Sequence, residues 1–519
     1  MSHVMAIDAG TGSVRACVFN LHGKLVSIAQ RAWEHDAEQG VPGSMGFVTE
    51  RNWPLIVEII IEALAAANLT GDDISALSST SMREGIVVLD AAGDEIWACA
   101  NVDARAEQEV RTLAAQDGLE ETIYDRTGQS FALAAGPRLL WLKTHRPDLY
   151  DRAATVLMLS EWVLYRLSGE RVMEPSNGST SGFVALDSRS GDPELLRACG
   201  LRDDLLPRTF EPGTVIGHVL PSAAEETGLS TSTRVVLGGG DAQLAALAMG
   251  LTAPGQAAIV AGTFWQQFVN LPTPSVDPQM RVRVNAAAIP DLWQAEAIAF
   301  HVGTSIRWFR DTFAQEEIRA AQETGAEPLD ALTAAASEIP IGSEGVIPIF
   351  SDVMNYRRWK HAAPSFLNLS LDIAGSHLRA AMFRSLLENA AIVAALNLEM
   401  VEDFSGTRAD EVVFAGGSAK SAVWTQIVAD VLGRTVRVPA VTEATAQGAA
   451  ACAAAGAGAF ATPSDAAAAW LSWERTVEPD AGAHAAYAQV RERWLAAYAP
   501  QRELMDAGIT TSLWRAPGS

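Results

Sequence analysis

A glycine- and hydroxyl-rich turn near the N-terminus carries the first residue types that could bind a phosphate. The string Asp8–Arg15 reads DAGTGSVR and lies between two apolar runs that predict strands. Glycine lets a backbone approach a phosphate without a Cβ clash, and successive amide N–H groups form an anion-binding concavity. We expect Asp8 to hold Mg²⁺ through water, and a plain hairpin turn is the alternative interpretation. The expected phosphate-binding residues are Gly10, Thr11, Gly12, Ser13 and Arg15.

A carboxylate follows a run of three glycines near the middle of the chain. Gly238–Gly240 are expected to form a turn after the predicted strand Arg234–Leu237, and Asp241 comes next. A carboxylate at the end of a strand, beside flexible glycines, is well placed to take a proton from an attacking hydroxyl. The alternative role for Asp241 is the N-cap of the helix that follows.

Two further small-residue turns lie in the second half of the chain. Gly262-Thr263 stands between two predicted strands, as the first turn does, and so predicts a second phosphate contact. Gly416-Gly417 follows the predicted strand Glu411–Ala415 at a bend where an adenine could lie flat. Each has an ordinary turn interpretation, but their order along the chain is more specific than any one of them. The chain has neither a dinucleotide fingerprint nor a GxxxxGK[ST] phosphate loop.

A charged pair just beyond the predicted strand Ile74–Ser81 indicates a polar acceptor pocket. Arg83 and Glu84 could hold hydroxyl or carbonyl groups through bidentate and charge-assisted hydrogen bonds. A surface ion pair is the alternative. Their position at the end of a strand favours the pocket.

Strands and helices must bring these residues together. The sequence shows the same order of predicted strands, small-residue turn and helix in each half of the chain. The first half opens with three predicted strands and a helix over Glu50–Asn68 with apolar residues at helical spacing. The second half repeats strand, small-residue turn and strand over Gln256–Asn270, then predicts a long helix over Ser376–Phe404. The repetition indicates two duplicated α/β domains facing one another, which we place at residues 1–245 and 246–519.

Length, charge and cysteine spacing narrow the class of protein. A chain of 519 residues is too long for one hydrophobic core. Its net charge of −24 repels nucleic acid and anionic membrane surfaces. Four widely spaced cysteines suit a reducing compartment, and the Ala/Gly-rich run Ala449–Ala461 predicts close helix packing rather than a membrane span. We therefore expect a cytoplasmic protein without nucleic-acid or membrane partners, either monomer or homodimer.

Taken in order, the motifs resemble the FGGY carbohydrate kinases, members of the actin-like ATPase superfamily. The resemblance covers nearly the full chain and implies two duplicated ribonuclease-H-like domains around an interdomain cleft. It implies that Asp241 is the catalytic base and that ATP and Mg²⁺ are the cofactors. The further ATP contacts that it implies are Gly262, Thr263, Gly303, Arg307, Gly416, Gly417 and Ser421.

The acceptor pocket resembles the same family at Met82–Glu84 and at a W…D-x-R block. The matching substrate residues are Arg83, Glu84, Trp97, Asp103 and Asp241. One subgroup with a linear acceptor, (S)-4,5-dihydroxypentane-2,3-dione, is similar in four further strings, and this implies phosphorylation of the terminal C5 hydroxyl. The four strings are Ile96–Arg105, Gly262–Gln267, His361–Phe366 and Thr510–Trp514.

Two departures from the family pattern argue against an ordinary polyol acceptor. Ala242 follows the base where glycerol kinases carry glutamine, and no Gly-Leu pair precedes His377-Leu378. A kinase for another small sugar or polyol, such as a pentulose or glycerol, stays the alternative. A non-kinase actin-like ATPase is a remote one.

Overall fold

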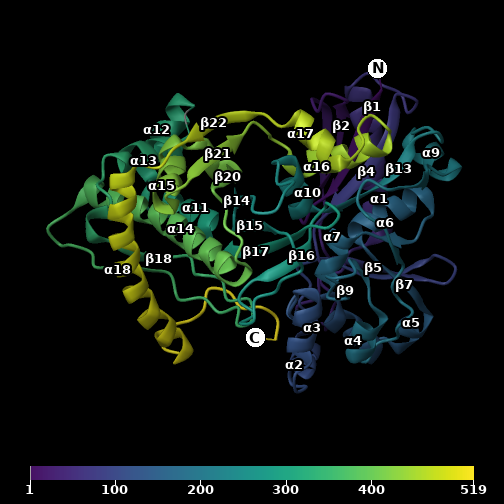
Figure 1. Ribbon diagram of the computed structural model, residues 1–519, viewed down its shortest axis with the longest axis horizontal. Helices are drawn as coiled ribbons and strands as arrows, with labels where there is room; N and C mark the ends of the chain where they lie inside the picture. The colour runs from purple at the N-terminus through teal and green to yellow at the C-terminus, as the bar shows by residue number, and fades with distance from the viewer. Residues whose placement is uncertain (1, 326, 519) are drawn as a thin grey trace.

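A six-stranded mixed sheet forms the centre of the first lobe in the computed structural model, which describes residues 2–325 and 327–518 (Figure 1). The strand order is β12-β13-β4-β1-β2-β3. β1, β2 and β3 are antiparallel neighbours, whereas β4 and β13 run parallel to β1. The bounds are β1 (His3–Ala9), β2 (Ser13–Asn20), β3 (Leu25–Ala32), β4 (Ile74–Ser81), β12 (Val215–His218) and β13 (Arg234–Gly240).

A seven-stranded sheet forms the second lobe and repeats the first. Its order is β16-β17-β15-β14-β20-β21-β22, in which β14, β15 and β17 are antiparallel and β20 and β21 run parallel to β14. The predicted duplication is therefore present in the strand pairing. The bounds are β14 (Ala257–Ala261), β15 (Trp265–Leu271), β16 (Arg283–Ala286), β17 (Trp293–Ala299), β20 (Glu411–Ala415), β21 (Thr435–Pro439) and β22 (Trp473–Val477).

Amphipathic and buried helices cover the two sheets. α1 (Thr49–Ala66) packs on β2 and β3, and α6 (Leu159–Ser168) packs on β4 and β13. In the second lobe α14 (Gly375–Ser405) packs on β15 and β17 and against α15 (Ala422–Leu432). α14 is long and apolar enough to cross a bilayer, but 89% of its most apolar window is buried inside the protein, as in a core helix.

Two helices between the lobes tie the halves together. α10 (Asp241–Ala248) contacts α16 (Ala444–Gly456), which packs against β1, β4 and β13 of the first sheet although it lies between β21 and β22 of the second sheet in the chain (Figure 1). Their approach is so close that a Cβ at Gly448 would lie 2.1 Å from the backbone oxygen of Leu244. Within the predicted run Ala449–Ala461, a Cβ at Gly456 would lie 2.4 Å from a side-chain carbon of Val236 on β13. The expected close helix packing of this Ala/Gly-rich run is therefore confirmed.

A smaller three-stranded sheet extends the first lobe. It orders β6 (Glu95–Cys99), β5 (Ile86–Asp90) and β7 (Ala153–Met158). The remaining helices of eight or more residues are α2 (Glu107–Ala114), α3 (Leu119–Thr127), α4 (Ala135–His145), α11 (Val302–Phe313), α12 (Gln315–Thr324), α13 (Pro328–Ser337), α17 (Pro463–Trp470) and α18 (Ala481–Asp506). The short helices are α5 (Pro147–Arg152), α7 (Pro175–Gly178), α8 (Pro193–Ala198) and α9 (Pro221–Thr227), and the short strands are β8 (Val172–Met173), β9 (Val184–Ala185), β10 (Ser190–Gly191), β11 (Arg208–Thr209), β18 (Ile347–Ile349) and β19 (Ser365–Leu367).

Two local expectations differ from the structure. Gly238–Gly240 do not form a turn but complete β13, since Gly239 and Gly240 pair with Thr80 and Ser81 of β4. Glycine is required at Gly238 because a Cβ there would lie 1.9 Å from the backbone oxygen of Ser79. Gly416-Gly417 do not lead straight into a helix, since a 3₁₀ turn over Gly417–Lys420 comes before α15.

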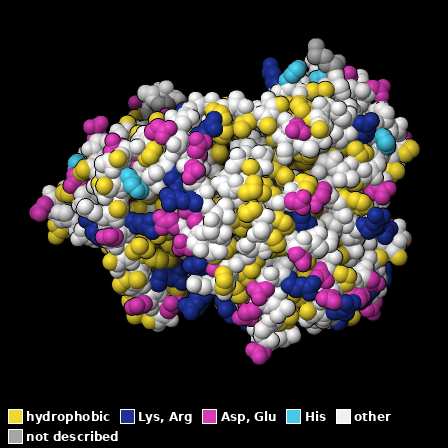
Figure 2. Space-filling model, in the orientation of Figure 1, with side chains coloured by type: hydrophobic (Ala, Val, Ile, Leu, Met, Phe, Trp, Pro, Cys, Tyr) yellow, Lys and Arg dark blue, Asp and Glu magenta, His cyan; other side chains and the backbone are white. Residues whose placement is uncertain are grey.

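On the face of the molecule shown in Figure 2, acidic and basic side chains are intermixed over both lobes. The carboxylates that contribute to the net charge of −24 are dispersed on that face.

Candidate active site

Three predicted residues lie together at the carboxyl ends of the parallel strands of the first sheet. Asp8 is the last residue but one of β1, Arg83 follows β4, and Asp241 follows β13. β1, β4 and β13 are mutually parallel, so their carboxyl ends face the same side, where α/β proteins commonly bind ligands. The Nε atom of Arg83 lies 3.6 Å from an Asp241 carboxylate oxygen.

A buried network of ion pairs lies beneath these strand ends and joins both lobes. Arg83 forms a two-pronged hydrogen-bonded ion pair with Glu296, of which the Nη2–Oε1 bond measures 2.9 Å. Arg283 pairs with Glu84 at 2.8 Å and lies 3.9 Å from Glu296. All four side chains are buried. Burial opposes ionisation of Glu296, but the two arginines outweigh it and hold the pKa of that carboxyl below its usual value.

Sequence reasoning missed Arg283 and Glu296. Both come from the second lobe, on β16 and β17, and neither belongs to a recognisable motif. The one available signal was Glu296 itself, a charged residue in the otherwise uncharged strand Trp293–Ala299. A charge is rarely buried unless it is paired, so such a residue predicts a partner without saying which.

Asp241 is a proton acceptor that is partly open to solvent. Burial raises the pKa of its carboxyl to about 6, and the nearby Arg83 guanidinium limits the rise. Its side chain is 38% exposed, and one carboxylate oxygen accepts the Ala242 amide at 2.6 Å. Asp241 is therefore the first residue of α10, whereas the N-cap is Gly240, so the capping alternative is wrong. Its carboxylate is also partly open to solvent. A carboxyl that ionises near neutral pH suits a general base.

Asp8 is electrostatically linked to Asp241. Burial raises the pKa of the Asp8 carboxyl to about 7, Arg15 opposes this, and the charge of Asp241 adds to it. Arg15 lies 3.8 Å from Asp8 and pairs at 2.8 Å with Glu443, at the start of α16. The negative charges of Asp241 and Glu443 near Asp8 favour a cation beside the Asp8 carboxylate.

The first phosphate turn is open to solvent and free of steric constraint from the protein. Thr11 and Gly12 are exposed between β1 and β2. A Cβ at Gly12 would meet no described atom within 4 Å, so protein packing does not require glycine there. Trp33 supports the turn by donating from Nε1 to the Gly10 carbonyl at 2.9 Å.

A cavity of about 810 Å³ in the second lobe collects the predicted nucleotide residues. The predicted residues that line it are Gly262, Thr263, Gly303, Arg307, Gly417 and Ser421. Arg307 donates to the Thr263 hydroxyl at 3.3 Å, and a Cβ at Gly303 would lie 2.5 Å from the Gly262 carbonyl. Gly416 lies behind the wall with φ +96°, where a Cβ would meet the Ala261 carbonyl at 2.6 Å. Ser421 also caps α15 by accepting the Trp424 amide.

A second cavity, of about 660 Å³, lies between the lobes. Arg83, Glu84 and Asp103 line it from the first lobe and Arg283 from the second. Asp103 is buried, accepts the Met45 amide at 2.6 Å and pairs with Arg105 at 2.8 Å, so it holds the wall together. Trp97 is not among the described residues that line this cavity.

Trp97 instead packs behind the cavity wall. Its ring stacks on Trp141 at 6.5 Å, and the guanidinium of Arg105 lies 5.3 Å from the ring centre. These contacts match the core-packing alternative for a lone aromatic residue.

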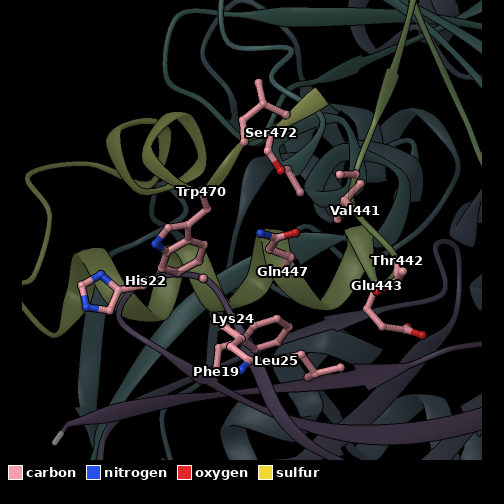
Figure 3. A pocket seen from close by; sticks show the side chains of 14 residues that line it. Phe19, His22, Lys24, Leu25, Val441, Thr442, Glu443, Gln447, Trp470 and Ser472 are labelled. Atoms are coloured by element: carbon pink, nitrogen blue, oxygen red, sulfur yellow. The ribbon is translucent and has the colours of Figure 1, made fainter. Parts of the chain in front are cut away.

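A third, smaller cavity of about 270 Å³ lies at the junction of the lobes (Figure 3). Trp470, Gln447 and Lys24 line it, and Glu443 marks the end nearer Arg15. The described lining includes none of the predicted site residues.

The residues around Asp8 fit a divalent cation that is held mainly by a phosphate ligand. Within residues 2–325 and 327–518, no three acidic, histidine or cysteine side chains converge as a protein-only metal site. Mg²⁺ commonly takes one or two carboxylates, with waters and phosphate oxygens completing its shell. The Asp8 carboxylate offers such a donor, and a cation there would favour its ionised form.

The comparisons with known proteins agree over nearly the whole chain. An autoinducer-2 kinase from Salmonella paratyphi B is 49% identical over 518 residues, 99% of this chain and 98% of that protein. An autoinducer-2 kinase from Escherichia coli is 48% identical over 518 residues, with the same coverage of 99% and 98%.

Solved structures confirm the expected two-domain, actin-like α/β fold. A xylulose kinase from Rhodospirillum rubrum matches with TM-score 0.86 and 26% identity, covering 97% of this chain and 100% of that one. Plasmodium falciparum glycerol kinase with ADP matches in fold with TM-score 0.83 and 16% identity, covering 96% and 98%.

Family models match both halves in sequence. Residues 3–248 match the N-terminal domain, and residues 257–457 the C-terminal domain, of the FGGY family of carbohydrate kinases. Together with the full-length relatives, these matches place the chain in a family of ATP-dependent kinases. The chain belongs to the FGGY family of carbohydrate kinases.

Proposed function

We propose that this kinase phosphorylates the C5 hydroxyl of (S)-4,5-dihydroxypentane-2,3-dione, the autoinducer-2 precursor, and so processes a quorum-sensing signal. The observation that carries the proposal is 49% identity to autoinducer-2 kinases over 99% of the chain. The cavity between the lobes supports it, since paired charges at its base suit a small acceptor rich in oxygen atoms.

Asp241 is the proposed catalytic base. The acceptor oxygen attacks the γ-phosphorus of ATP while the bond to the β,γ-bridging oxygen breaks and ADP leaves with that electron pair. Asp241 takes the hydroxyl proton, for which a pKa of about 6 is suitable near neutral pH. Arg83 lies 3.6 Å from Asp241 and keeps it ionised and oriented.

The phosphates are proposed to lie between two glycine turns, one in each lobe. Amides around Gly12 and Gly262 would grip them from opposite sides, and Arg307 beside Thr263 would add positive charge. Mg²⁺ held near Asp8 would neutralise charge on the phosphates. Closure of the lobes would exclude water and so limit hydrolysis of ATP.

The cellular setting follows from the same assignment. All four cysteines are free and buried, as expected in the reducing cytoplasm where ATP and a phosphorylated signal would be retained. Small-molecule acceptor and ATP are the proposed partners, and either a monomer or a homodimer fits the site.

A sugar kinase is the second candidate, supported by the match to a xylulose kinase at TM-score 0.86 and 26% identity. Mass spectrometry of products after incubation with ATP, Mg²⁺ and the dione, xylulose, ribulose or glycerol separates the two. The proposal expects a kcat/KM at least about tenfold higher for the dione, the scale on which a pocket separates close analogues. Preference for a sugar would overturn it.

The matched control for that assay is the substitution Asp241→Asn. It should lower kcat by about 10²–10⁴-fold, the usual contribution of a positioned base, while ATP affinity stays near the wild-type value. Near-normal turnover by this variant would remove Asp241 from the role of base.

A further inference from the structure

The last residues of the chain return to the cleft after the outer helix α18. The C-terminal tail, defined here as residues 510–518, ends between the two lobes in Figure 1. Ser512 fixes its path, because its hydroxyl accepts the His361 amide at 3.0 Å and donates to the Trp514 carbonyl at 2.7 Å. A backbone bridge between Lys360 and Arg515 adds a second anchor.

Trp514 supplies an apolar wall to the acceptor cavity. Its ring stacks on Phe300 at 5.3 Å with an interplanar angle of 19°, and meets Trp359 edge-on at 5.4 Å. Trp514, Phe300 and Trp359 all line the cavity whose base is the charged network around Arg83. One side of the cavity is therefore polar and charged, whereas the side formed with the tail is aromatic.

The end of the tail reaches the opposite lobe. A Cβ at Gly518 would lie 2.5 Å from Val110 and 3.2 Å from the Glu107 carbonyl, both on α2 of the first lobe. The tail is anchored on the second lobe through Ser512 and Trp514, so it spans the cleft over the acceptor cavity. Opening of the lobes would have to break its contact with α2.

The same wall carries marks of a ligand-binding site. Trp359 and His301 line the cavity in left-handed conformations, with φ of +46° and +60°, as does Glu84 opposite them with φ of +62°. Such backbone strain in residues with side chains clusters at ligand sites. The Nε1 of Trp359 is buried without a hydrogen-bond partner among the described residues, and it can only donate.

We propose that the C-terminal tail is a strap that closes the acceptor cavity, with Trp514 as a specificity-determining residue. The proposal rests on the proposed acceptor, whose end remote from the reacting hydroxyl is a methyl ketone. The methyl group packs on Trp514 and Phe300, and a carbonyl oxygen accepts from Trp359. A pentulose would place a hydroxymethyl group on the same aromatic wall and lose a hydrogen bond to water there.

The test compares Trp514→Ala, Trp514→Phe and a truncation after Thr510 with the control Leu513→Ala, a tail side chain that is 46% exposed. At saturating MgATP, Trp514→Ala and the truncation should raise the KM for the dione about tenfold or more, the scale of lost apolar pocket contacts. The KM for ATP should stay within about twofold, because the nucleotide lies in the other cavity. Trp514→Phe should restore most of the loss.

Hydrolysis of ATP without acceptor gives a readout that does not depend on the acceptor's identity. Loss of the strap should increase it several-fold in Trp514→Ala and in the truncation but not in Leu513→Ala, since the cavity admits more water. If wild-type enzyme prefers another acceptor, the proposed function fails, and the KM comparison is made with that acceptor. Trp514→Ala matching Leu513→Ala in both measurements would overturn the strap.

Discussion

Arg83 from the first lobe and Glu296 from the second form a buried, two-pronged ion pair across the boundary between the halves of the chain. The pair lies under the acceptor cavity, and Arg83 also lies 3.6 Å from Asp241. The contact that joins the lobes therefore also sets the charge environment of the candidate base.

Replacing Glu296 with glutamine should destabilise the protein strongly. The change leaves the buried Arg83 and Arg283 with one negative partner fewer, and breaking a buried pair costs about 3–5 kcal/mol. Chemical denaturation measures the loss. The control Asp203→Asn breaks a pair with Arg197 in which both side chains are about half exposed, and it should cost under about 1 kcal/mol. Equal effects of the two changes would contradict the role of the network.

The rate of phosphoryl transfer should fall in acid with the titration of Asp241. Burial raises the pKa of this carboxyl to about 6, and only the ionised form can accept the hydroxyl proton. At saturating MgATP, kcat/KM for the acceptor should be level above about pH 7 and fall about tenfold per unit well below pH 6. Replacing Arg83 with methionine removes the charge that lowers this pKa, so the acid limb should move to higher pH. A rate that is constant from pH 5 to 8 would exclude titration of Asp241.

Gly12→Ala should weaken ATP binding without weakening the fold. The new Cβ would meet no described atom within 4 Å, so thermal stability should stay the same or increase slightly. A phosphate approaching the same backbone would meet the methyl group, and the KM for ATP should rise about tenfold or more. Thermal melts and steady-state kinetics check the two effects together. An unchanged KM for ATP would remove this turn from the phosphate site.

Gly448→Ala should damage the junction between the lobes. Its Cβ would lie 2.1 Å from the Leu244 backbone oxygen, and backbone cannot yield as a flexible side chain does. Separation of α16 from α10 should cost about 1–3 kcal/mol or more and displace Asp241, the first residue of α10. In the control Gly482→Ala, the Cβ would meet only the side chain of Asp480, at 3.2 Å. A variant as stable as this control would contradict the close packing.

Much of the fold could be predicted because the relevant signals are local. Apolar runs bounded by turn residues gave β4 and β20 with the observed bounds, and helical spacing located α1 and α14 to within one or two residues. The duplication was also predictable, since strand, small-residue turn and strand occur once in each half.

The parts that escaped prediction depend on contacts between distant segments. Nothing near Arg283 or Glu296 in sequence indicates Arg83, which is separated from Glu296 by 213 residues. The three glycines before Asp241 looked like a turn, but they form a strand because they pair with β4, which leaves space only for glycine at position 238. Local propensity cannot report a constraint that a neighbouring strand imposes.

The return of α16 to the first sheet also has a consequence for how the protein is made. Ala446 and Ala450 cover Val4 and Ala6 of β1, although more than 400 residues separate them in the chain. During translation, the first sheet must wait with that apolar face uncovered until nearly the whole polypeptide has left the ribosome. Release of the finished nascent chain, rather than emergence of its first half, should therefore be the moment at which the N-terminal lobe acquires full resistance to proteolysis.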